Sequence, residues 1–314
     1  MGSVYSREYD SRAREERACS PDALAAILEQ QREAFLRDGP PSLEKRRADL
    51  AKLRLAIKDS ADRIADVISA DFGNRSRNES LLAEVYATRA AIRYFLRHLA
   101  QWMRPKRVPV SLELQRGRAR ILFQPVGIVG IITPWNYPFQ LAILPLATAL
   151  AAGNRVILKP SELAPRTAQF IADFLARLFP LEQVTTVLGD QTAGAALSAL
   201  PLDHLLYTGS TTVGRLVMRA AAENLTPVTL ELGGKSPCII GEDAALPAAV
   251  ESILYGKLVN AGQSCIAPDY ALVPAAMREE FIRLAGQAVR RMYPNLNNNA
   301  DYTRACRQLL QGHT

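Results

Sequence analysis

The sequence predicts an α/β fold in which a group of helices precedes a doubly wound parallel sheet. One observation is the helical spacing of apolar residues from Pro21 to about Trp102. A second is the change after Arg118, where short apolar runs alternate with helical stretches. Runs that are apolar throughout and joined by helices indicate parallel strands covered on both faces. A ligand is therefore expected at the carboxyl ends of the strands.

The N-terminal part is expected to form amphipathic helices. Ser42 suits the N-cap of one helix, and its apolar stripe repeats at spacings of three, four and seven residues. Another helix runs from about Glu79 to Trp102 and is stopped by Pro105. The stripe of the first helix consists of Leu43, Leu50, Leu53, Ile57, Ile64 and Val67.

The rest of the chain alternates between strands and helices. Pro138 and Pro165 are expected in the first turn of their helices, and Gly153 at a helix C-cap. The strands are predicted at 121–124, 127–132, 155–159, 184–188, 204–207, 228–232, 237–240 and 270–273. The helices are predicted at 138–152, 165–179, 191–199, 212–223, 247–259 and 276–291.

Composition sets the broad class of the protein. With 314 residues, 48% hydrophobic and 22% charged, the chain suits a globular protein of about two domains. The net charge is +7, and the excess lies in the first 120 residues, which carry 24 basic and 17 acidic residues. Arginine is mixed with acidic residues there, as on a solvated helix face, and no basic stretch is interleaved with stacking aromatics. We therefore expect no nucleic-acid partner.

Cysteine and histidine usage excludes other classes of site. The four cysteines are scattered without a CxxC pair, and only three histidines accompany them, so we expect neither a metal site nor a disulfide framework. Reduced thiols fit a cytoplasmic location. The polar first 20 residues are expected to be a disordered tail without the apolar core of a signal peptide. The most apolar stretch, 138–153, is too short to cross a bilayer, so no membrane association is expected.

Polar residues cluster where the predicted strands end. Asn136 is either a turn former or a donor aimed at a developing oxyanion. Lys159 and Glu162 either form a surface ion pair or bind a ribose diol through hydrogen bonds. Gly209 and Ser210 lead into a helix, which makes them either an ordinary cap or a site for pyrophosphate.

Two further residues are candidates for a general base and a nucleophile. Glu231 ends a strand beside two glycines and is either a capping carboxylate or a general base whose pKa is raised by burial. Cys265 lies among small polar residues in a predicted loop, where an exposed thiol is more plausible than the inert core cysteine that is the commoner case. Cys238, by contrast, is inside an apolar strand.

Taken together, five strings resemble the NAD(P)-dependent aldehyde dehydrogenase superfamily. The string APDY at 267–270 is similar to the class 3 branch, and the whole chain to its coniferyl-aldehyde-dehydrogenase-like members. The resemblance extends from about residue 22 to Thr303. The five strings, in family order, are TPWNYPF (133–139), KPSE (159–162), YTGSTTVG (207–214), ELGGKSP (231–237) and NAGQSC (260–265).

The resemblance implies oxidation of an aldehyde to a carboxylic acid with NAD or NADP. Cys265 would be the nucleophile, Asn136 an oxyanion donor, and Glu231 the base that activates water to hydrolyse a thioester. A small-molecule aldehyde is the implied substrate, and a homodimer the implied assembly. The cofactor-binding residues carried over are Pro134, Trp135, Lys159, Ser161, Glu162, Gly209, Ser210, Gly214 and Leu232.

Length is the main departure from the family. Family members are considerably longer, and the E-x-F-G-P segment and C-terminal arm do not follow Cys265 here. The resemblance thus implies N-terminal helices with a nucleotide-binding domain at 21–235 and an incomplete α/β catalytic domain at 236–314. An alternative is a catalytically impaired, truncated remnant that binds nucleotide or a full-length homologue. A cysteine hydrolase finds little support, because no histidine lies in a motif that would pair it with the thiol.

Overall fold

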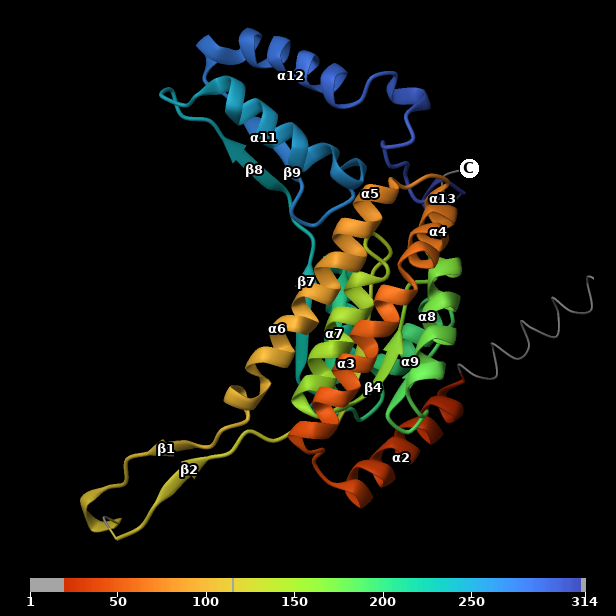
Figure 1. The fold of residues 1–314 in the computed structure, drawn as a ribbon, viewed down its shortest axis with the longest axis vertical. Coiled ribbons are helices and arrows are strands. Elements are labelled where there is room, and N and C mark those ends of the chain that lie inside the picture. The colour runs from red at the N-terminus through yellow and green to blue at the C-terminus, as the bar shows by residue number, and fades with distance from the viewer. Residues whose placement is uncertain (1–19, 115, 312–314) are drawn as a thin grey trace, which may run out of the picture.

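A five-stranded parallel sheet forms the centre of the molecule (Figure 1). The computed structural model describes residues 20–114 and 116–311, so most of the predicted tail lies outside the described residues. The strand order is β5-β4-β3-β6-β7, and all four pairings are parallel. The doubly wound fold is confirmed. The strands are β3 (Ile128–Ile132), β4 (Arg155–Lys159), β5 (Val184–Thr186), β6 (His204–Gly209) and β7 (Val228–Leu232).

Alternate residues of each central strand face opposite helical layers. Val129 and Ile131 of β3 pack into one hydrophobic cluster, whereas Ile128 and Ile132 pack into another. The period of two along a strand therefore places a separate core on each side of the sheet. One cluster contains residues of α3 (Leu43–Asp59), α4 (Ala61–Phe72), α6 (Ala87–Trp102), α7 (Gln140–Ala152) and α8 (Pro165–Leu178). The other contains residues of α2 (Pro21–Asp38), α9 (Gln191–Ser198) and α10 (Thr211–Ala222).

The N-terminal helices follow the predicted pattern with two interruptions. Ser42 caps α3 as expected, accepting a hydrogen bond from the backbone N–H of Lys45. The apolar stripe, however, spans two helices, because the chain breaks at Ser60 between α3 and α4. The second predicted helix begins as the short α5 (Arg77–Glu79) and continues through a π-helical stretch, η1 (Ser80–Tyr86), into α6. Such single π segments occur mostly inside α-helices and often at functional sites.

Two sequence predictions fail at the start of the sheet. The strand expected at 121–124 is β2 (Ala119–Ile121), which pairs antiparallel with β1 (Lys106–Val108) in a separate hairpin. Figure 1 shows this hairpin projecting from the body. Pro138 is not in the first turn of its helix, because α7 begins at Gln140. Pro165 and Gly153 do occupy their predicted cap positions, the glycine with φ of 91°.

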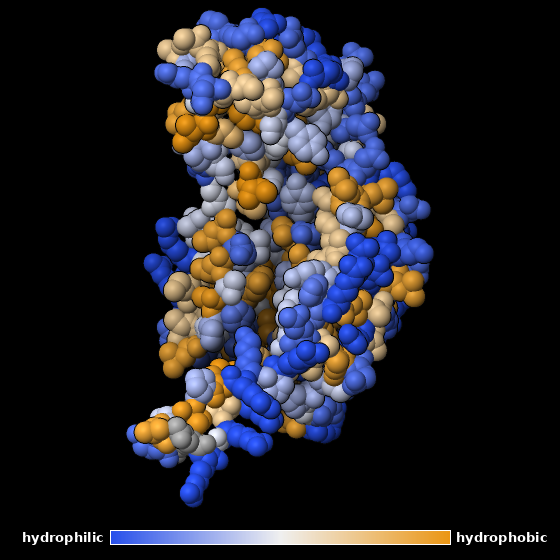
Figure 2. All heavy atoms as spheres, turned by 60° about the vertical axis from the view of Figure 1, so that its left-hand side comes forward, coloured by the Kyte–Doolittle hydropathy of each residue, from blue (hydrophilic) through white to orange (hydrophobic). Residues whose placement is uncertain are grey.

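A second lobe follows β7. Its two-stranded parallel sheet pairs β8 (Ser236–Ile239) with β9 (Pro268–Leu272), and α11 (Leu246–Leu258) packs with α12 (Arg278–Met292). The side chains of Ile239 and Ile266 are 77% and 81% exposed. Figure 2 shows apolar side chains on the surface of this lobe and of the hairpin. The short elements of the region are η3 (Val259–Gly262), η4 (Ala275–Met277), η5 (Leu296–Asn298) and α13 (Arg307–Gln311).

Within the described residues, no helix is both long and apolar enough to span a bilayer. Residues 140–152 of the most apolar stretch form α7, which contains Pro145 within the helix.

Gly127 is a position at which a substitution is expected to destabilise the fold. Its φ of 135° is disfavoured for other residues, and a Cβ there would lie 2.1 Å from Oδ2 of Asp203. That carboxylate accepts the N–H of Ile128 at 2.7 Å, so it cannot move away without losing a strand-end hydrogen bond. We expect Gly127→Ala to lower the free energy of unfolding by about 2–4 kcal/mol, measured by urea denaturation.

The matched control for this prediction is Gly233→Ala. A Cβ at Gly233 has no neighbouring atom within 4 Å, so the change should stay within about 0.5 kcal/mol. Equal stability of the two variants would show that the strain at Gly127 is relieved by local movement.

Candidate functional site

Most of the predicted site residues lie at or just beyond the carboxyl ends of the strands, whereas Cys265 follows η3 in the second lobe. The strand order reverses at β3, which has β4 on one side and β6 on the other. In open α/β sheets such a reversal opens a crevice that binds ligands. Loop 133–139 follows β3, loop 160–164 follows β4, and Ser210 follows β6. The sheet therefore gathers the predicted residues of three motifs at one edge.

Asn136 contacts the loop that carries Cys265. Its side-chain Nδ2 donates a hydrogen bond to the backbone carbonyl of Gln263 at 3.1 Å. Its Oδ1 is buried without a hydrogen-bond partner, and its backbone carbonyl accepts bonds from Arg75 and Asn260. The side-chain amide of Asn136 has two N–H groups, and the bond to Gln263 uses one of them. The other can donate to a developing oxyanion, so the turn-forming and the oxyanion-donor interpretations are compatible.

Cys265 follows a turn of unusual conformation. Asn260, Ala261 and Gly262 have φ angles of 52°, 53° and 77°, a left-handed run in which two of the three residues are not glycine. The Cys265 side chain beyond this turn is exposed, whereas Cys238 is half-buried on β8 and Cys306 is buried. The loop setting predicted for Cys265 is what the structure shows, and it makes this thiol the most accessible of the three described cysteines.

Lys159 and Glu162 form an ion pair across the end of β4. The lysine side chain is 3% exposed and the glutamate side chain 39%. Ser161 between them is buried, and its Oγ accepts the N–H of Leu163 at 3.3 Å. The pair thus consists of a buried cation and an accessible carboxylate, a combination that offers both a donor and an acceptor to a sugar diol.

The turn after β6 caps a twelve-residue helix. Ser210 accepts the N–H of Val213 through its Oγ at 3.3 Å, so it is the N-cap of α10, and Gly209 ends the strand before it. No acidic side chain occupies the first turn of α10, which leaves the positive end of the helix dipole uncompensated. Gly214 permits close packing, since a Cβ there would lie 2.8 Å from Leu232. These features fit a pyrophosphate group.

Glu231 lies on β7, the edge strand of the sheet. It is in register with Thr208 of β6, one residue before Gly209. Its side chain is exposed, and no hydrogen bond or ion pair among the described residues joins it to Asn136 or Cys265. The structure therefore places Glu231 at the predicted sheet edge, but the burial expected for a general base there is wrong, because the side chain of this edge-strand residue faces solvent. Its contact with the cysteine loop remains a prediction.

Pro134 and Trp135 complete the loop after β3. The ring of Trp135 lies 6.3 Å from that of Phe72, and the side chain packs against the cluster beneath the N-terminal helices. Burial raises the pKa of nearby Tyr137, which keeps its hydroxyl protonated at neutral pH. Trp135 thus contributes to the rigidity of the loop, while its predicted contact with a cofactor stays a prediction.

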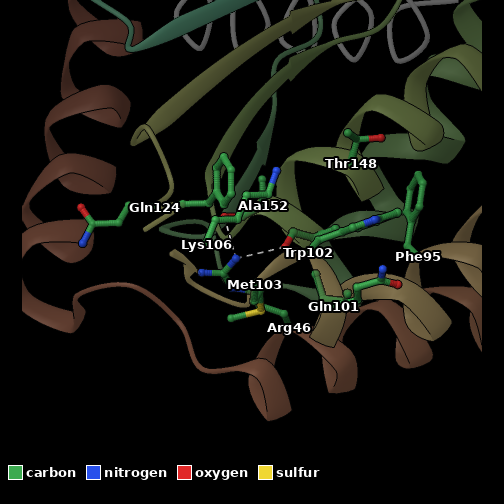
Figure 3. A pocket seen from close by; sticks show the side chains of 12 residues that line it. Arg46, Phe95, Gln101, Trp102, Met103, Lys106, Gln124, Thr148 and Ala152 are labelled. Carbon is green, nitrogen blue, oxygen red and sulfur yellow. Dashed lines mark hydrogen bonds between the residues drawn. The ribbon is translucent and has the colours of Figure 1, made fainter. Parts of the chain in front are cut away.

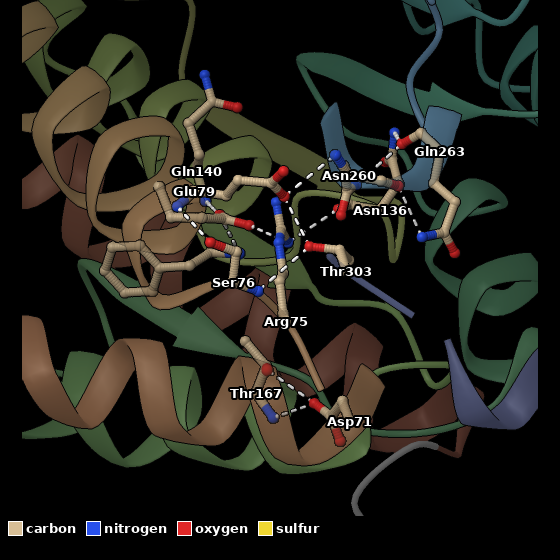
Figure 4. Close-up of polar contacts among 12 residues, drawn as sticks. Asp71, Arg75, Ser76, Glu79, Asn136, Gln140, Thr167, Asn260, Gln263 and Thr303 are labelled. Atoms are coloured by element: carbon tan, nitrogen blue, oxygen red, sulfur yellow. Dashed lines mark hydrogen bonds and ion pairs between the residues drawn. The ribbon is translucent and has the colours of Figure 1, made fainter. Parts of the chain in front are cut away.

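A group of charged residues behind these loops was missed by the sequence analysis. Arg75 and Glu79 reach loop 133–140 and the turn at Asn260 from the segment that joins α4 to α6 (Figure 4). Glu84, on the same segment, accepts the backbone N–H of Phe139. Arg75 and Glu84 form an ion pair in which neither side chain is exposed. Complete burial raises the pKa of Glu84, against the opposing effect of Arg75. The available signal was the presence of charged residues within an otherwise helical apolar segment.

A separate cavity lies away from the predicted site. It measures about 600 Å³ and is lined mainly by apolar side chains of α6, α7 and the base of the hairpin, including Phe95 and Trp102 (Figure 3). Arg46 reaches its wall, where it donates hydrogen bonds to the carbonyls of Ala151 and Ala152 at the end of α7. None of the predicted site residues lines this cavity.

Side chains that could bind a metal ion form no cluster in the part of the chain that the structure describes. No group of three or more His, Cys, Asp and Glu side chains there could hold a metal ion.

Comparisons with known proteins agree with the motifs. The model of the aldehyde dehydrogenase family matches residues 9–303. The chain is 48% identical over 280 residues to the probable coniferyl aldehyde dehydrogenase of Pseudomonas aeruginosa strain PAO1, covering 89% of this chain and 59% of that protein. It is 45% identical over 282 residues to the coniferyl aldehyde dehydrogenase of Pseudomonas sp. strain HR199, covering 90% of this chain and 58% of that protein.

A solved structure shares the fold. The substrate-bound AldH of Staphylococcus aureus superposes with a TM-score of 0.87 and 36% sequence identity, covering 90% of this chain and 61% of that one. The chain thus spans somewhat less than two thirds of the relatives that it matches, in sequence and in structure.

Proposed function

The chain belongs to the aldehyde dehydrogenase family, and on that basis we propose that it oxidises an aldehyde to a carboxylic acid with NAD(P)+ through a covalent intermediate on Cys265. The observation that carries the proposal is the hydrogen bond between Asn136 and the backbone of Gln263. It brings a side-chain amide to the loop that presents an exposed thiol, as attack on a carbonyl group requires.

The first chemical step belongs to Cys265. Its thiolate attacks the aldehyde carbon, forming a C–S bond and a negatively charged oxygen. The Asn136 amide and the backbone N–H of Cys265 would donate hydrogen bonds to that oxygen. The tetrahedral adduct is a far better hydride donor than the free aldehyde, which is why a covalent step serves this oxidation.

The cofactor site is proposed at the carboxyl edge of the sheet. Lys159 and Glu162 would hold the adenine ribose, and Gly209 and Ser210 the pyrophosphate at the N-terminus of α10. Pro134, Trp135, Ser161, Gly214 and Leu232 would line the site. When bound, NAD(P)+ supplies the acceptor for the hydride that leaves the adduct. Glu162 opposes a 2′-phosphate through its charge, whereas Lys159 favours one, so both cofactors belong in the assay.

Glu231 is proposed to complete the reaction. Its carboxylate would take a proton from water, whose oxygen attacks the thioester carbon, and the C–S bond would break to release the acid and the thiol. The exposed position of Glu231 on an edge strand gives it access to bulk water. The role requires the second lobe to bring Cys265 within reach of this carboxylate.

We expect Glu231→Gln to slow release of the acid more than formation of NADH. The amide cannot accept a proton from water, and loss of a general base costs about 10²–10⁴-fold in rate. Stopped-flow absorbance of NADH in an active form of the enzyme should show a first-turnover burst followed by very slow turnover. Equal slowing of the burst and the steady state would mean that Glu231 acts before the thioester forms.

The direct test of the proposal is NADH formation from NAD+ and an aldehyde. Coniferyl aldehyde is the first substrate to try, because two Pseudomonas relatives carry that name. The same assay with NADP+ compares the cofactors. A protein that turns over neither cofactor with aliphatic or aryl aldehydes would not support the proposal.

A second candidate is a catalytically impaired form that binds nucleotide or a full-length homologue. The observation that favours it is the exposed apolar surface at Ile239, Ile266 and Leu272 in the second lobe. Calorimetric NAD+ binding without NADH formation would support this candidate. A homodimer is proposed from the family, and sedimentation velocity would show whether this chain forms one.

A further inference from the structure

We propose that Arg75 and Glu79 are positioning residues that hold the loops carrying Asn136 and Cys265 in a fixed relation to each other. The inference rests on the proposed function and extends it to residues of the N-terminal helical segment. We call Arg75, Glu79 and Glu84, together with Asn136 and Asn260, the polar cluster; three of them are buried, and Glu79 and Asn136 are half-buried. Figure 4 shows most of its members converging between the helices and the two loops.

Arg75 holds the loop after β3. Its Nη1 pairs with Oε1 of Glu84 at 2.7 Å and also donates to the backbone carbonyl of Asn136 at 3.1 Å. The other carboxylate oxygen of Glu84 accepts the N–H groups of Phe139 and Gln140 at 3.1 and 2.6 Å. The ion pair therefore fixes both ends of the segment 136–140, including the start of α7.

The arrangement is poorly explained by stability alone. Arg75 and Glu84 are removed from solvent, and Nε and Nη2 of the guanidinium have no hydrogen-bond partner. Buried ion pairs often add no more stability than apolar residues of similar size, and donors without partners add a cost. What this pair supplies is position, because Nη1 alone joins the Glu84 carboxylate to the backbone carbonyl of Asn136.

Glu79 holds the loop before Cys265. Its Oε2 accepts the backbone N–H of Asn260 at 3.1 Å and the hydroxyl of Thr303 at 2.7 Å. Asn260 begins the left-handed run, and its conformation is unfavourable unless the surroundings hold it. A charge-assisted hydrogen bond to its N–H is such a restraint.

Asn260 joins the two loops directly. Its Nδ2 donates to the carbonyl of Asn136 at 2.9 Å and to that of Gln263 at 3.1 Å, and its side chain is fully buried. The backbone carbonyl of Asn136 thus accepts two hydrogen bonds. One comes from Arg75, which supports the loop after β3, and the other comes from Asn260 in the loop before Cys265. Replacing Arg75 or Glu79 should leave each loop attached to its own strand or helix. The position of one loop relative to the other should become less fixed.

Hydrogen–deuterium exchange with mass spectrometry on the chain of residues 1–314 tests this inference. The first variant is Arg75→Met with Glu84→Gln, so that no unpaired charge is buried while an acceptor for Phe139 and Gln140 is kept. The matched control is Arg77→Met, since Arg77 lies on the same segment but pairs with Asp62 at the surface. We expect amide exchange in 136–140 and 260–265 to accelerate about tenfold or more in the double variant alone.

A second pair of variants addresses Glu79. Glu79→Ala should accelerate exchange in 260–265, and Glu79→Gln, which keeps an acceptor oxygen, should restore part of the protection. Glu33→Ala, on the exposed face of α2, is the control. Exchange that accelerates uniformly over the sheet and the loops would show a merely structural role and overturn the inference, as would unchanged exchange in both loops.

The two proposals fail separately. If no aldehyde is oxidised, the proposed function fails, but local exchange in the two loops still decides whether Arg75 and Glu79 restrain them.

Discussion

Replacing Cys265 with alanine is expected to abolish aldehyde oxidation, and any ester hydrolysis, in an active form of this protein. The thiolate is the only group that forms a covalent bond to the substrate in the proposed mechanism. Without it, no adduct forms that can release a hydride. We expect NADH formation to fall by at least about 10³-fold, to the background of the assay. Intact-mass spectrometry with a slowly hydrolysed ester should show acylation of the parent and none of the variant.

Cys238→Ala is the matched control for this experiment. Cys238 is half-buried on β8, and its neighbours in register are on β9 rather than in either loop of the site. Activity should therefore stay within about twofold of the parent. Equal loss of activity in the two variants would contradict the assignment of Cys265 as nucleophile.

The second large effect is expected from the length of the chain. Residues 1–314 should form NADH at least about 100-fold more slowly than a version extended with the C-terminal third of a close relative. The two-stranded sheet of the second lobe leaves Ile239 and Leu272 77% and 52% exposed, so the described residues leave these side chains largely uncovered. Cys265 follows this lobe's helix α11 and depends on its position. A displacement of about 1 Å is enough to cost 10²-fold in rate.

Nucleotide binding should be affected less than turnover. The motifs at Lys159, Gly209 and Ser210 lie on or next to the five-stranded sheet, in which every strand pairs with at least one neighbour. Isothermal titration with NAD+ on the same two proteins measures this difference. Comparable turnover of the short and extended forms would show that the second lobe positions Cys265 without further packing.

The sheet was predictable because local signals agreed with one another. The strands at 155–159 and 228–232 were placed to the residue, since each run is bounded by a clear turn or cap. The covering of both faces by helices was predictable because strands that are apolar throughout indicate burial on both sides, whereas the strand order β5-β4-β3-β6-β7 was not predicted. The hairpin at 106–121 was misplaced because its short strands carry no alternation strong enough to distinguish it from a sheet strand.

The site was predictable only in part. Motif order predicts Asn136, Lys159, Gly209 and Cys265 as site residues, and in the structure Lys159 and Gly209 end strands while Asn136 and Cys265 lie in loops. Their chemical roles stay predictions. The positions of Arg75, Glu79 and Glu84 were not predictable. Their partners lie between 9 and 224 residues away along the chain, as in the bond from Thr303 to Glu79. A local reading of a helix gives no information about such long-range pairs.

The shared core of the N-terminal helices and the sheet affects how this protein is made. Leu50 and Leu53 of α3 belong to the same cluster as Val156 of β4 and Phe170 of α8, more than a hundred residues later in the chain. At typical elongation rates of about 5–20 residues per second, α3 leaves the ribosome on the order of ten seconds before its partners. During that interval its apolar stripe can pack against residues of α4 and α6, which emerge soon after it, but not against the sheet. The N-terminal helices should therefore be able to associate early, whereas completion of this shared core should wait until β4 and α8 have emerged.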